Sequence, residues 1–147
     1  MRGPGTNTVS TVQLELDSNL DSVDSAEAAV LREAQSLGLE EDDLHRVGIA
    51  VRECMVNAVV HGNRYNARKH VHLKVERTPE ALTIIIADEG AGFDPDAVPD
   101  PLEGDNLLRQ SGRGVMMIRA FMDDIAITKL SPCGTEVKMV KYKAGKV

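Results

Sequence analysis

Apolar residues near the start of the chain follow two successive patterns. Val12, Leu14 and Leu16 alternate with polar residues, which predicts a β-strand with one buried face. Apolar positions then recur at intervals of three and four over residues 26–37, which predicts an amphipathic helix. Gly38 is a natural end for this helix, because glycine readily adopts the left-handed conformation that closes many helices. The polar segment before the helix, SNLDSVDS, supplies residues suited to capping its N-terminus.

A second helix is predicted next, because its apolar residues keep the three-four spacing. Asp42 or Asp43 is placed to cap this helix, and Gly62-Asn63 is placed to end it. The apolar positions that define it are Leu44, Val47, Val51, Met55, Ala58 and Val59. We therefore expect it to bury one face and to carry polar residues on the other.

The second half of the chain contains two predicted strand pairs, separated by a long connection and a helix. Strands over 71–77 and 81–88 form a hairpin through TPE, and the second is apolar enough to lie at the centre of a sheet. Residues 89–111 are rich in glycine, proline and aspartate, and a connection of this length is usually functional or mobile. A third helix is expected over 114–122. The closing strand pair, joined by SPCG, covers 124–130 and 134–142.

The order of these elements predicts an α+β fold. We expect a two-layer α/β sandwich, in which a mixed but mostly antiparallel sheet is covered on one face by about three helices. A doubly wound nucleotide-binding fold would instead alternate strands and helices. The phosphate-binding motif G-x-x-x-x-G-K-[ST] does not occur in the sequence.

Length and composition narrow the class of protein further. The 147 residues are enough for one domain, expected over 8–147 after a flexible tail over 1–7. The net charge of −6 disfavours direct nucleic-acid binding, which needs a basic surface. No apolar run approaches the roughly 18 residues of a membrane span, and the first residues lack the apolar segment of a secretory signal. Cys54 and Cys133 form neither a disulfide framework nor a zinc motif, so we expect a cytoplasmic protein.

The first candidate site lies in the second helix, in the stretch ECMVNAVVHGN. Glu53, Asn57 and His61 are spaced by four and share one stripe of the helix. A solvated stripe opposite the core would explain them equally simply. Because valines flank the stripe on both sides, we favour a polar row that borders an apolar cavity.

The second candidate site is the segment DEGAGFD, which follows the most apolar strand. Asp88 ends that strand, where its carboxylate can accept hydrogen bonds from an amino group such as that of adenine. Gly90 and Gly92 permit positive φ angles and a close approach of the backbone to a ligand. A simple turn with an Asp-x-Gly sequence is an equally good interpretation of these residues alone.

Two further motifs follow downstream. Gly112 and Gly114 precede the third helix, whose free amides would suit a phosphate, although a flexible N-cap is the simpler interpretation. Arg113 and Arg109 can add positive charge there. Thr135 begins the last strand after a glycine turn, where its hydroxyl can support Asp88 or a ring nitrogen, although an ordinary strand threonine fits as well.

Taken in order, these motifs are more specific than any one of them. E-x-x-x-N-x-x-x-H-G, D-x-G-x-G-F, G-x-G before a helix and G-T on a late strand together resemble the Bergerat-type ATP-binding fold. Gyrase, histidine kinases and the mismatch-repair ATPases share that fold. The resemblance covers about residues 8–142, and it implies that the chain binds ATP with Mg²⁺.

Within this fold, the sequence resembles the bacterial anti-sigma factor serine/threonine kinases. The chain is short, its helix motif continues as NAVVHGN, and GVMMIRAFMDDI is similar to that family's helix followed by Met and acidic residues. A histidine kinase would more often show a lysine-aromatic ending after the Asn. It would also carry a dimerisation helix with a phosphoacceptor histidine, whereas His45 lies within the helix of the ATP motif.

The resemblance also implies roles for individual residues. Glu53 would be the general base, and Asn57 would hold Mg²⁺. Asp88 would bind the adenine amino group, with Gly90 and Gly92 beside the base. The other residues that it places at the nucleotide are His61, Gly62, Asn63, Phe93, Arg109, Gly112, Arg113, Gly114, Val115 and Thr135.

Two features depart from the family pattern. Arg113 stands between two glycines where relatives often carry an apolar residue, and we favour a phosphate contact for it over a helix cap. The long connection is acidic, which is unfavourable near a triphosphate unless the side chains face water. Its acidic residues before Arg109 are Asp94, Asp96, Asp100, Glu103 and Asp105. We therefore expect a mobile lid that Mg-ATP orders.

The resemblance implies partners as well as a reaction. The protein substrate would be a STAS-domain anti-sigma factor antagonist, and a sigma factor would be the second partner. A homodimer through the sheet edge or the first strand is expected, with no direct contact to nucleic acid or a membrane. Two alternatives stay open, namely an ATP-binding regulator that sequesters a partner without transferring phosphate, and the catalytic domain of a split histidine kinase.

Overall fold

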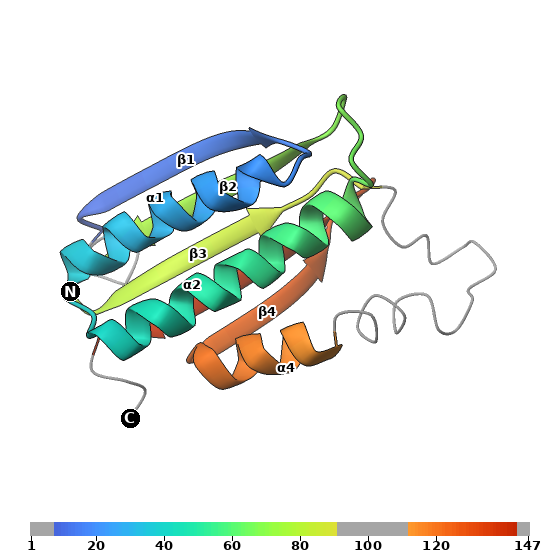
Figure 1. The fold of residues 1–147 in the computed structure, drawn as a ribbon. Helices are drawn as coiled ribbons and strands as arrows, with labels where there is room; N and C mark the ends of the chain where they lie inside the picture. The colour runs from blue at the N-terminus through green and yellow to red at the C-terminus, as the bar shows by residue number, and fades with distance from the viewer. Residues whose placement is uncertain (1–7, 91–111, 144–147) are drawn as a thin grey trace.

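A five-stranded sheet forms one layer of the computed structural model, and helices cover one of its faces (Figure 1). The structure describes residues 8–90 and 112–143, without the side chains of residues 112–115. The strands are β1 (Ser10–Asp17), β2 (His70–Arg77), β3 (Ala81–Ala87), β4 (Asp124–Lys129) and β5 (Thr135–Tyr142). The helices are α1 (Asp21–Leu37), α2 (Glu41–Val56), the π-helical η2 (Asn57–Gly62) and α4 (Gly112–Phe121). The predicted α+β sandwich is therefore confirmed.

The strand order is β1-β2-β3-β5-β4, and all four pairings in the described residues are antiparallel. As predicted from its apolar composition, β3 is the central strand. β5 pairs with β3 as well as with β4, so the last strand enters the sheet and β4 lies at its edge. Because β3 and β5 are neighbours, the residues after β3 and before β5 meet at the same end of the sheet.

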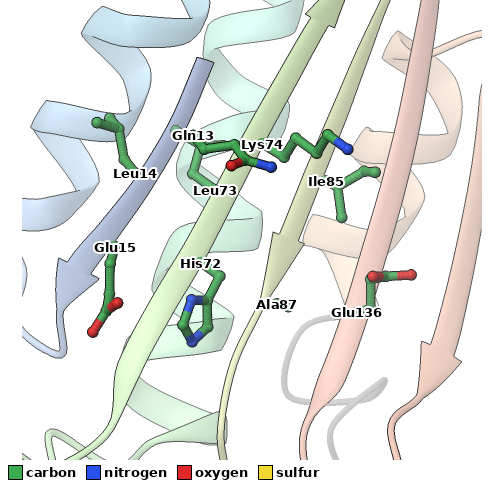
Figure 2. A pocket seen from close by; sticks show the side chains of 9 residues that line it. All are labelled: Gln13, Leu14, Glu15, His72, Leu73, Lys74, Ile85, Ala87 and Glu136. Atoms are coloured by element: carbon green, nitrogen blue, oxygen red, sulfur yellow. The ribbon is translucent and has the colours of Figure 1, made fainter. Parts of the chain in front are cut away.

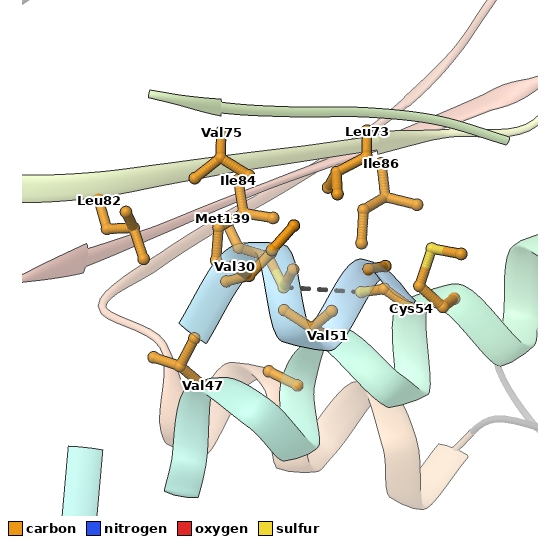
Figure 3. Packing of buried hydrophobic residues seen from close by; sticks show 14 of the residues in the cluster. Val30, Val47, Val51, Cys54, Leu73, Val75, Leu82, Ile84, Ile86 and Met139 are labelled. Carbon is orange, nitrogen blue, oxygen red and sulfur yellow. Dashed lines mark hydrogen bonds between the residues drawn. The ribbon is translucent and has the colours of Figure 1, made fainter. Parts of the chain in front are cut away.

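The core lies between the inner face of the sheet and helices α1 and α2 (Figure 3). Alternate residues of the strands point into it, as period-two patterning requires. The largest fully buried side chains include Met55, Leu73, Leu82, Ile84, Ile86 and Met139. Cys54 is also buried, with its Sγ 3.6 Å from the Sδ of Met139, and burial raises the pKa of its thiol to about 12. Cys54 is thus a neutral packing residue.

The first helix begins at Asp21, five residues before the expected start. The side chain of Asn19 accepts a hydrogen bond from the backbone N–H of Ser22 at 3.1 Å, so the polar segment forms the first helical turn instead of preceding it. Gly38 ends the helix as predicted, with φ of 91° and its N–H directed at the carbonyls of the last turn.

The predicted cap of the second helix is wrong by two residues or more. Glu40 is the N-cap, because the N–H of Leu44 donates to the Glu40 carbonyl at 2.9 Å. Asp42 and Asp43 lie in the first turn, where their negative charges interact favourably with the helix dipole. Asp43 has a tertiary role as well, since Lys141 reaches its carboxylate at 3.5 Å and also donates to the Phe121 carbonyl at 2.9 Å. Lys141 thereby ties the end of α4 to the start of α2.

The first strand is less buried than its alternation predicts. Val12 and Leu16 pack against the core, but Leu14 is 36% exposed. This difference follows from its position, because β1 is the other edge strand of the sheet. None of the helices in the described part of the chain is long and apolar enough to cross a membrane.

Candidate functional site

The helix that carries Glu53, Asn57 and His61 changes type within this stretch. Glu53 lies on α2, whereas Asn57, His61 and Gly62 lie on the π-helical η2. The N–H of Asn63 donates to the carbonyl of Ala58 at 2.8 Å, which is the five-residue spacing of a π-turn. The helix therefore reaches Gly62 as predicted, but its last turn is wider than an α-turn. Such turns are rare and frequently occur at functional sites.

Asp88 lies just after the central strand and is only 8% exposed. Its Oδ1 accepts hydrogen bonds from the N–H of Gly90 at 2.9 Å and from that of Thr135 at 3.2 Å. Its own N–H donates to the Thr135 carbonyl at 3.0 Å. Burial raises the pKa of the Asp88 carboxyl, and the two backbone hydrogen bonds oppose that rise. The carboxylate is thus held in one orientation, in a site where a hydrogen-bonding ligand would compensate for lost water.

The sequence predicts that the hydroxyl of Thr135 supports Asp88 or a ring nitrogen. The structure links Thr135 to Asp88 through the backbone N–H and carbonyl of Thr135. The glycine before it forms the expected turn, and Gly134 has φ of +101°. A Cβ on Gly134 would lie 2.3 Å from the Asp88 carbonyl oxygen, so the turn requires glycine for space as well as for conformation.

Two further glycines bring the end of η2 against the loop after β3. A Cβ on Gly62 would lie 2.4 Å from the Asp88 Oδ2, and a Cβ on Gly90 would lie 2.2 Å from the Gly62 carbonyl oxygen. Segments almost thirty residues apart in the sequence therefore meet with no room for a methyl group. Gly62 of the E-x-x-x-N-x-x-x-H-G motif and Gly90 of the D-x-G motif therefore lie together beside the Asp88 carboxylate.

Replacing Gly90 by alanine is expected to destabilise the fold by about 1–3 kcal/mol, the usual cost of overpacking, because backbone rather than a flexible side chain meets the new methyl. Urea denaturation would measure this loss. Gly48→Ala is the matched control, since its Cβ would meet the end of the Glu27 side chain, which can move. An equal effect of the two substitutions would contradict the close packing of Gly90 against Gly62.

Asn63 is buried, with 2% exposure, and its side chain holds three segments together. Its Oδ1 accepts from the N–H of Glu89 at 2.8 Å, and its Nδ2 donates to Ser18 Oγ and to the His70 carbonyl, each at 2.9 Å. Both amide donors are thus used within the protein. The Asn63 side chain therefore fixes the residue next to Asp88, and the place of Asn63 at the nucleotide stays a prediction.

Ser18 is a part of this arrangement that sequence reasoning missed. Its Oγ donates to the Lys69 carbonyl at 2.5 Å while accepting from Asn63. The sequence signal is ambiguous, because Ser18 opens the segment SNLDSVDS, whose residues also suit a helix cap. Its true partners are 45 and 51 residues away.

Glu89, the residue after Asp88, contacts His72 on the open face of the sheet, which is the face that the helices do not cover. His72 bonds its carboxylate at 2.5 Å, and this hydrogen bond is the main cause that lowers the pKa of Glu89. The open face also has a groove of about 550 Å³ (Figure 2), lined by Gln13, Leu14, Glu15, His72, Leu73, Lys74, Ile85, Ala87 and Glu136. None of Glu53, Asn57 and Asp88 lines it, so the groove is separate from the candidate site.

Several predicted site residues lie outside the described part of the chain. These are Gly92, Phe93 and Arg109, with the acidic residues Asp94, Asp96, Asp100, Glu103 and Asp105. The backbone of Gly112, Arg113, Gly114 and Val115 forms the first turn of α4, so the G-x-G motif lies within the helix start and not before it. The predicted start of this helix, at residue 114, was two residues late.

A family model described as a histidine kinase-like ATPase domain matches residues 16–141. The chain belongs to this family. The match runs from the end of β1 almost to the end of β5, so all the described elements that meet at Asp88 are part of the histidine kinase-like ATPase domain.

Among characterised members of the family, the chain is similar to serine-protein kinases and anti-sigma factors. It is 32% identical over 112 residues to the serine-protein kinase RsbW of Staphylococcus epidermidis, which covers 71% of this chain and 69% of that protein. It is 30% identical over 103 residues to the anti-sigma F factor of Bacillus subtilis, which covers 69% of this chain and 70% of that protein. The predicted resemblance to the anti-sigma factor kinases is therefore confirmed as homology.

Proposed function

We propose that this chain is an ATP-dependent serine-protein kinase and anti-sigma factor, and that its protein substrate is a STAS-type anti-sigma factor antagonist. The observation that carries the proposal is the buried, oriented carboxylate of Asp88, packed against the end of the helix that bears Glu53 and Asn57. Homology to RsbW and to the anti-sigma F factor supports the two halves of the proposal, kinase and anti-sigma factor.

Asp88 would select the base of the nucleotide. Its Oδ1 is already bonded to two backbone N–H groups, so its Oδ2 would accept from the 6-amino group of adenine. Gly62 and Gly90 would act through the close packing that fixes the Asp88 carboxylate, Gly92 would let the purine approach the backbone, and Phe93 and Thr135 would lie beside it. Asn63 would act through Glu89 and Gly90, by fixing the loop that follows Asp88.

The phosphates would lie between the second helix and the start of α4. Gly112, Gly114 and Val115 would offer backbone N–H groups of the first helical turn, where the helix dipole favours an anion. Arg109 and Arg113 would add positive charge. His61 would close the site from the last turn of the π-helix.

The donor set fits Mg²⁺ held mainly by the nucleotide. In residues 8–90 and 112–143, no three His, Cys, Asp or Glu side chains gather as a metal site. Asn57 would add one amide oxygen, and phosphate oxygens and water would complete the octahedral shell that Mg²⁺ prefers. When bound, the ion would neutralise charge on the phosphates.

The transfer step would need one protein base. Glu53 would take the proton of the substrate serine hydroxyl as that oxygen bonds the γ-phosphorus and the bond to the leaving ADP oxygen breaks. Glu53 precedes Asn57 by four residues, one helical turn, so base and phosphates would lie along the same helix. Once the antagonist is phosphorylated, the kinase would be free to hold a sigma factor.

The test is incubation of the protein with Mg-ATP and a candidate STAS-type antagonist. We expect acid-stable phosphoserine on the antagonist, identified by mass spectrometry. Capture of a partner with no phosphate transfer would contradict the kinase and favour a nucleotide-dependent sequestering protein. Acid-labile phosphohistidine would favour the catalytic domain of a split histidine kinase.

A further inference from the structure

The loop that follows η2 is basic in an acidic chain. Its residues 64–69, RYNARK, carry three cations, whereas the whole chain has a net charge of −6. We call these six residues the basic loop. Arg64, Tyr65 and Arg68 are exposed, and no carboxylate of the described residues forms an ion pair with the three cations. Among the described residues, Arg64 and Arg68 thus present positive charge to solvent without an ion-pair partner, whereas Lys69 is half-buried.

The basic loop also holds a backbone conformation that side chains disfavour. Arg64 and Tyr65 have φ of 51° and 58°, two consecutive left-handed residues of which neither is glycine. Local hydrogen bonds maintain this conformation. The N–H of Tyr65 donates to the Val59 carbonyl at 3.0 Å, and the N–H of Asn66 donates to the Asn63 carbonyl at 3.0 Å.

These hydrogen bonds give the loop a fixed shape with its aromatic residue outside. Tyr65 is 51% exposed, although a tyrosine usually covers its ring. The Asn66 side chain accepts from the N–H of Arg68 at 2.9 Å and closes the next turn. Strain of this kind persists where the surrounding structure enforces it, and it is concentrated at functional sites.

The basic loop is attached directly to the nucleotide cluster. Asn63, whose side chain fixes Glu89, immediately precedes it, and the Ser18 hydroxyl binds its last carbonyl, that of Lys69. The positive charge of Lys69 also opposes the rise in the Asp88 pKa that burial causes. In Figure 1 the loop extends beyond the end of the second helix, at the same end of the molecule as the end of β3.

We propose that the basic loop is the docking surface for an acidic face of the protein substrate, beside the cluster around Asp88. This inference rests on the proposed kinase function and adds the means by which the kinase recognises its protein partner. Tyrosine and arginine are the residue types that most often dominate binding energy in protein interfaces. The exposed cations Arg64 and Arg68 would steer an acidic partner, and the exposed ring of Tyr65 would bury against it.

The first test removes the charge of the loop. The double variant Arg64→Gln/Arg68→Gln is compared with Arg32→Gln/Lys138→Gln, which removes two exposed cations from α1 and the open face. With a STAS-type antagonist as substrate at saturating Mg-ATP, we expect the loop variant to raise KM by about tenfold while kcat and the Kd for ATP stay within about twofold. We also expect the KM of the wild type to rise more steeply with salt concentration than the KM of the loop variant. Equal KM values for the loop variant and the control would overturn the proposal.

The second test separates docking from structure. Tyr65→Gly removes the ring and relieves the left-handed strain, so we expect an equal or higher Tm together with weaker binding of the antagonist. A merely structural role would leave binding unchanged. Unchanged antagonist affinity in Tyr65→Gly would therefore count against docking at this loop.

A third experiment tests docking separately from kinase activity. Binding of the antagonist is measured with a non-hydrolysable ATP analogue, so no transfer is needed. If the wild type transfers no phosphate but the loop variant still loses about tenfold in binding, the kinase proposal fails and docking stands. Tighter binding of a short single-stranded RNA than of the antagonist, abolished in the loop variant, would overturn docking of a protein.

Discussion

Replacing Glu53 by glutamine is expected to slow phosphate transfer by about 10²–10⁴-fold, the usual contribution of a positioned general base. Glutamine keeps the size and hydrogen-bonding shape of the side chain but cannot accept the serine proton. Because Glu53 lies a full turn before Asn57, and the end of the helix that meets Asp88 is at Gly62, ATP binding should change by no more than about twofold. Single-turnover transfer of labelled phosphate, with a parallel ATP titration, measures both quantities.

The matched control is Glu41→Gln, which removes an exposed carboxylate from the start of the same helix. We expect that variant to transfer phosphate at the wild-type rate. Transfer by Glu53→Gln at the rate of the control would remove Glu53 from the chemistry. Loss of ATP binding in Glu53→Gln, at the same level as its loss of transfer, would instead assign Glu53 to the nucleotide site.

Replacing Asp88 by asparagine is expected to weaken ATP binding by about 10–100-fold while the fold is retained. In the variant, the amide oxygen would keep the hydrogen bonds from Gly90 and Thr135, because only an oxygen can accept them. The NH₂ group would then take the place of Oδ2, so two hydrogen-bond donors, this NH₂ and the 6-amino group of adenine, would face each other. A 6-oxo purine offers an acceptor there, so the preference for ATP over ITP should fall or reverse.

Calorimetric titration of both nucleotides into wild type and Asp88→Asn measures this change in selectivity. Asp42→Asn, an exposed carboxylate on the first turn of α2, is the control and should leave both affinities unchanged. An Asp88→Asn variant that keeps the wild-type ratio of ATP to ITP affinity would show that Asp88 does not read the 6-amino group.

The raised pKa of Asp88 gives a further expectation for stability. A carboxyl with a folded-state pKa above its unfolded value binds its proton more tightly in the folded state. Its contribution to stability is therefore present at low pH and is lost as pH rises from the unfolded pKa of about 3.9 through the raised folded value. At neutral pH the buried charge is unfavourable, so Asp88→Asn should be at least as stable as wild type in urea. A clearly lower free energy of unfolding for Asp88→Asn than for wild type at pH 7 would contradict the expected direction of this effect.

Much of the fold follows from local patterning. The spacing of apolar residues placed both hairpins, the central position of β3 and the end of α1 at Gly38, because each depends on burial or on one residue's backbone preference. The start of α1 was missed because a serine-rich and aspartate-rich segment suits a cap and a first turn equally well. The exposure of Leu14 was missed because alternation does not reveal that a strand lies at an edge.

The candidate site was predictable as a set of motifs but not as an arrangement. Nothing local indicates that Gly62 must be glycine because Asp88 lies against it, or that Asn63 bonds Ser18, His70 and Glu89. Those contacts join residues that are up to 45 positions apart, and the fold alone brings them together. The π-turn at Asn57–Gly62 leaves no signature in the spacing either, since its side chains fit an α-helical pattern equally well.

We predict that one nucleotide lies between the second helix and the end of β3, with Asn57 at the phosphates and Asp88 at the base. Titration of Mg-ATP into wild type, Asn57→Ala and Asp88→Ala under the same conditions tests it most directly. We predict that both variants lose at least about tenfold in affinity, and that removing Mg²⁺ costs the wild type more affinity than it costs Asn57→Ala. Two variants that bind Mg-ATP as tightly as the wild type would show that the nucleotide binds elsewhere.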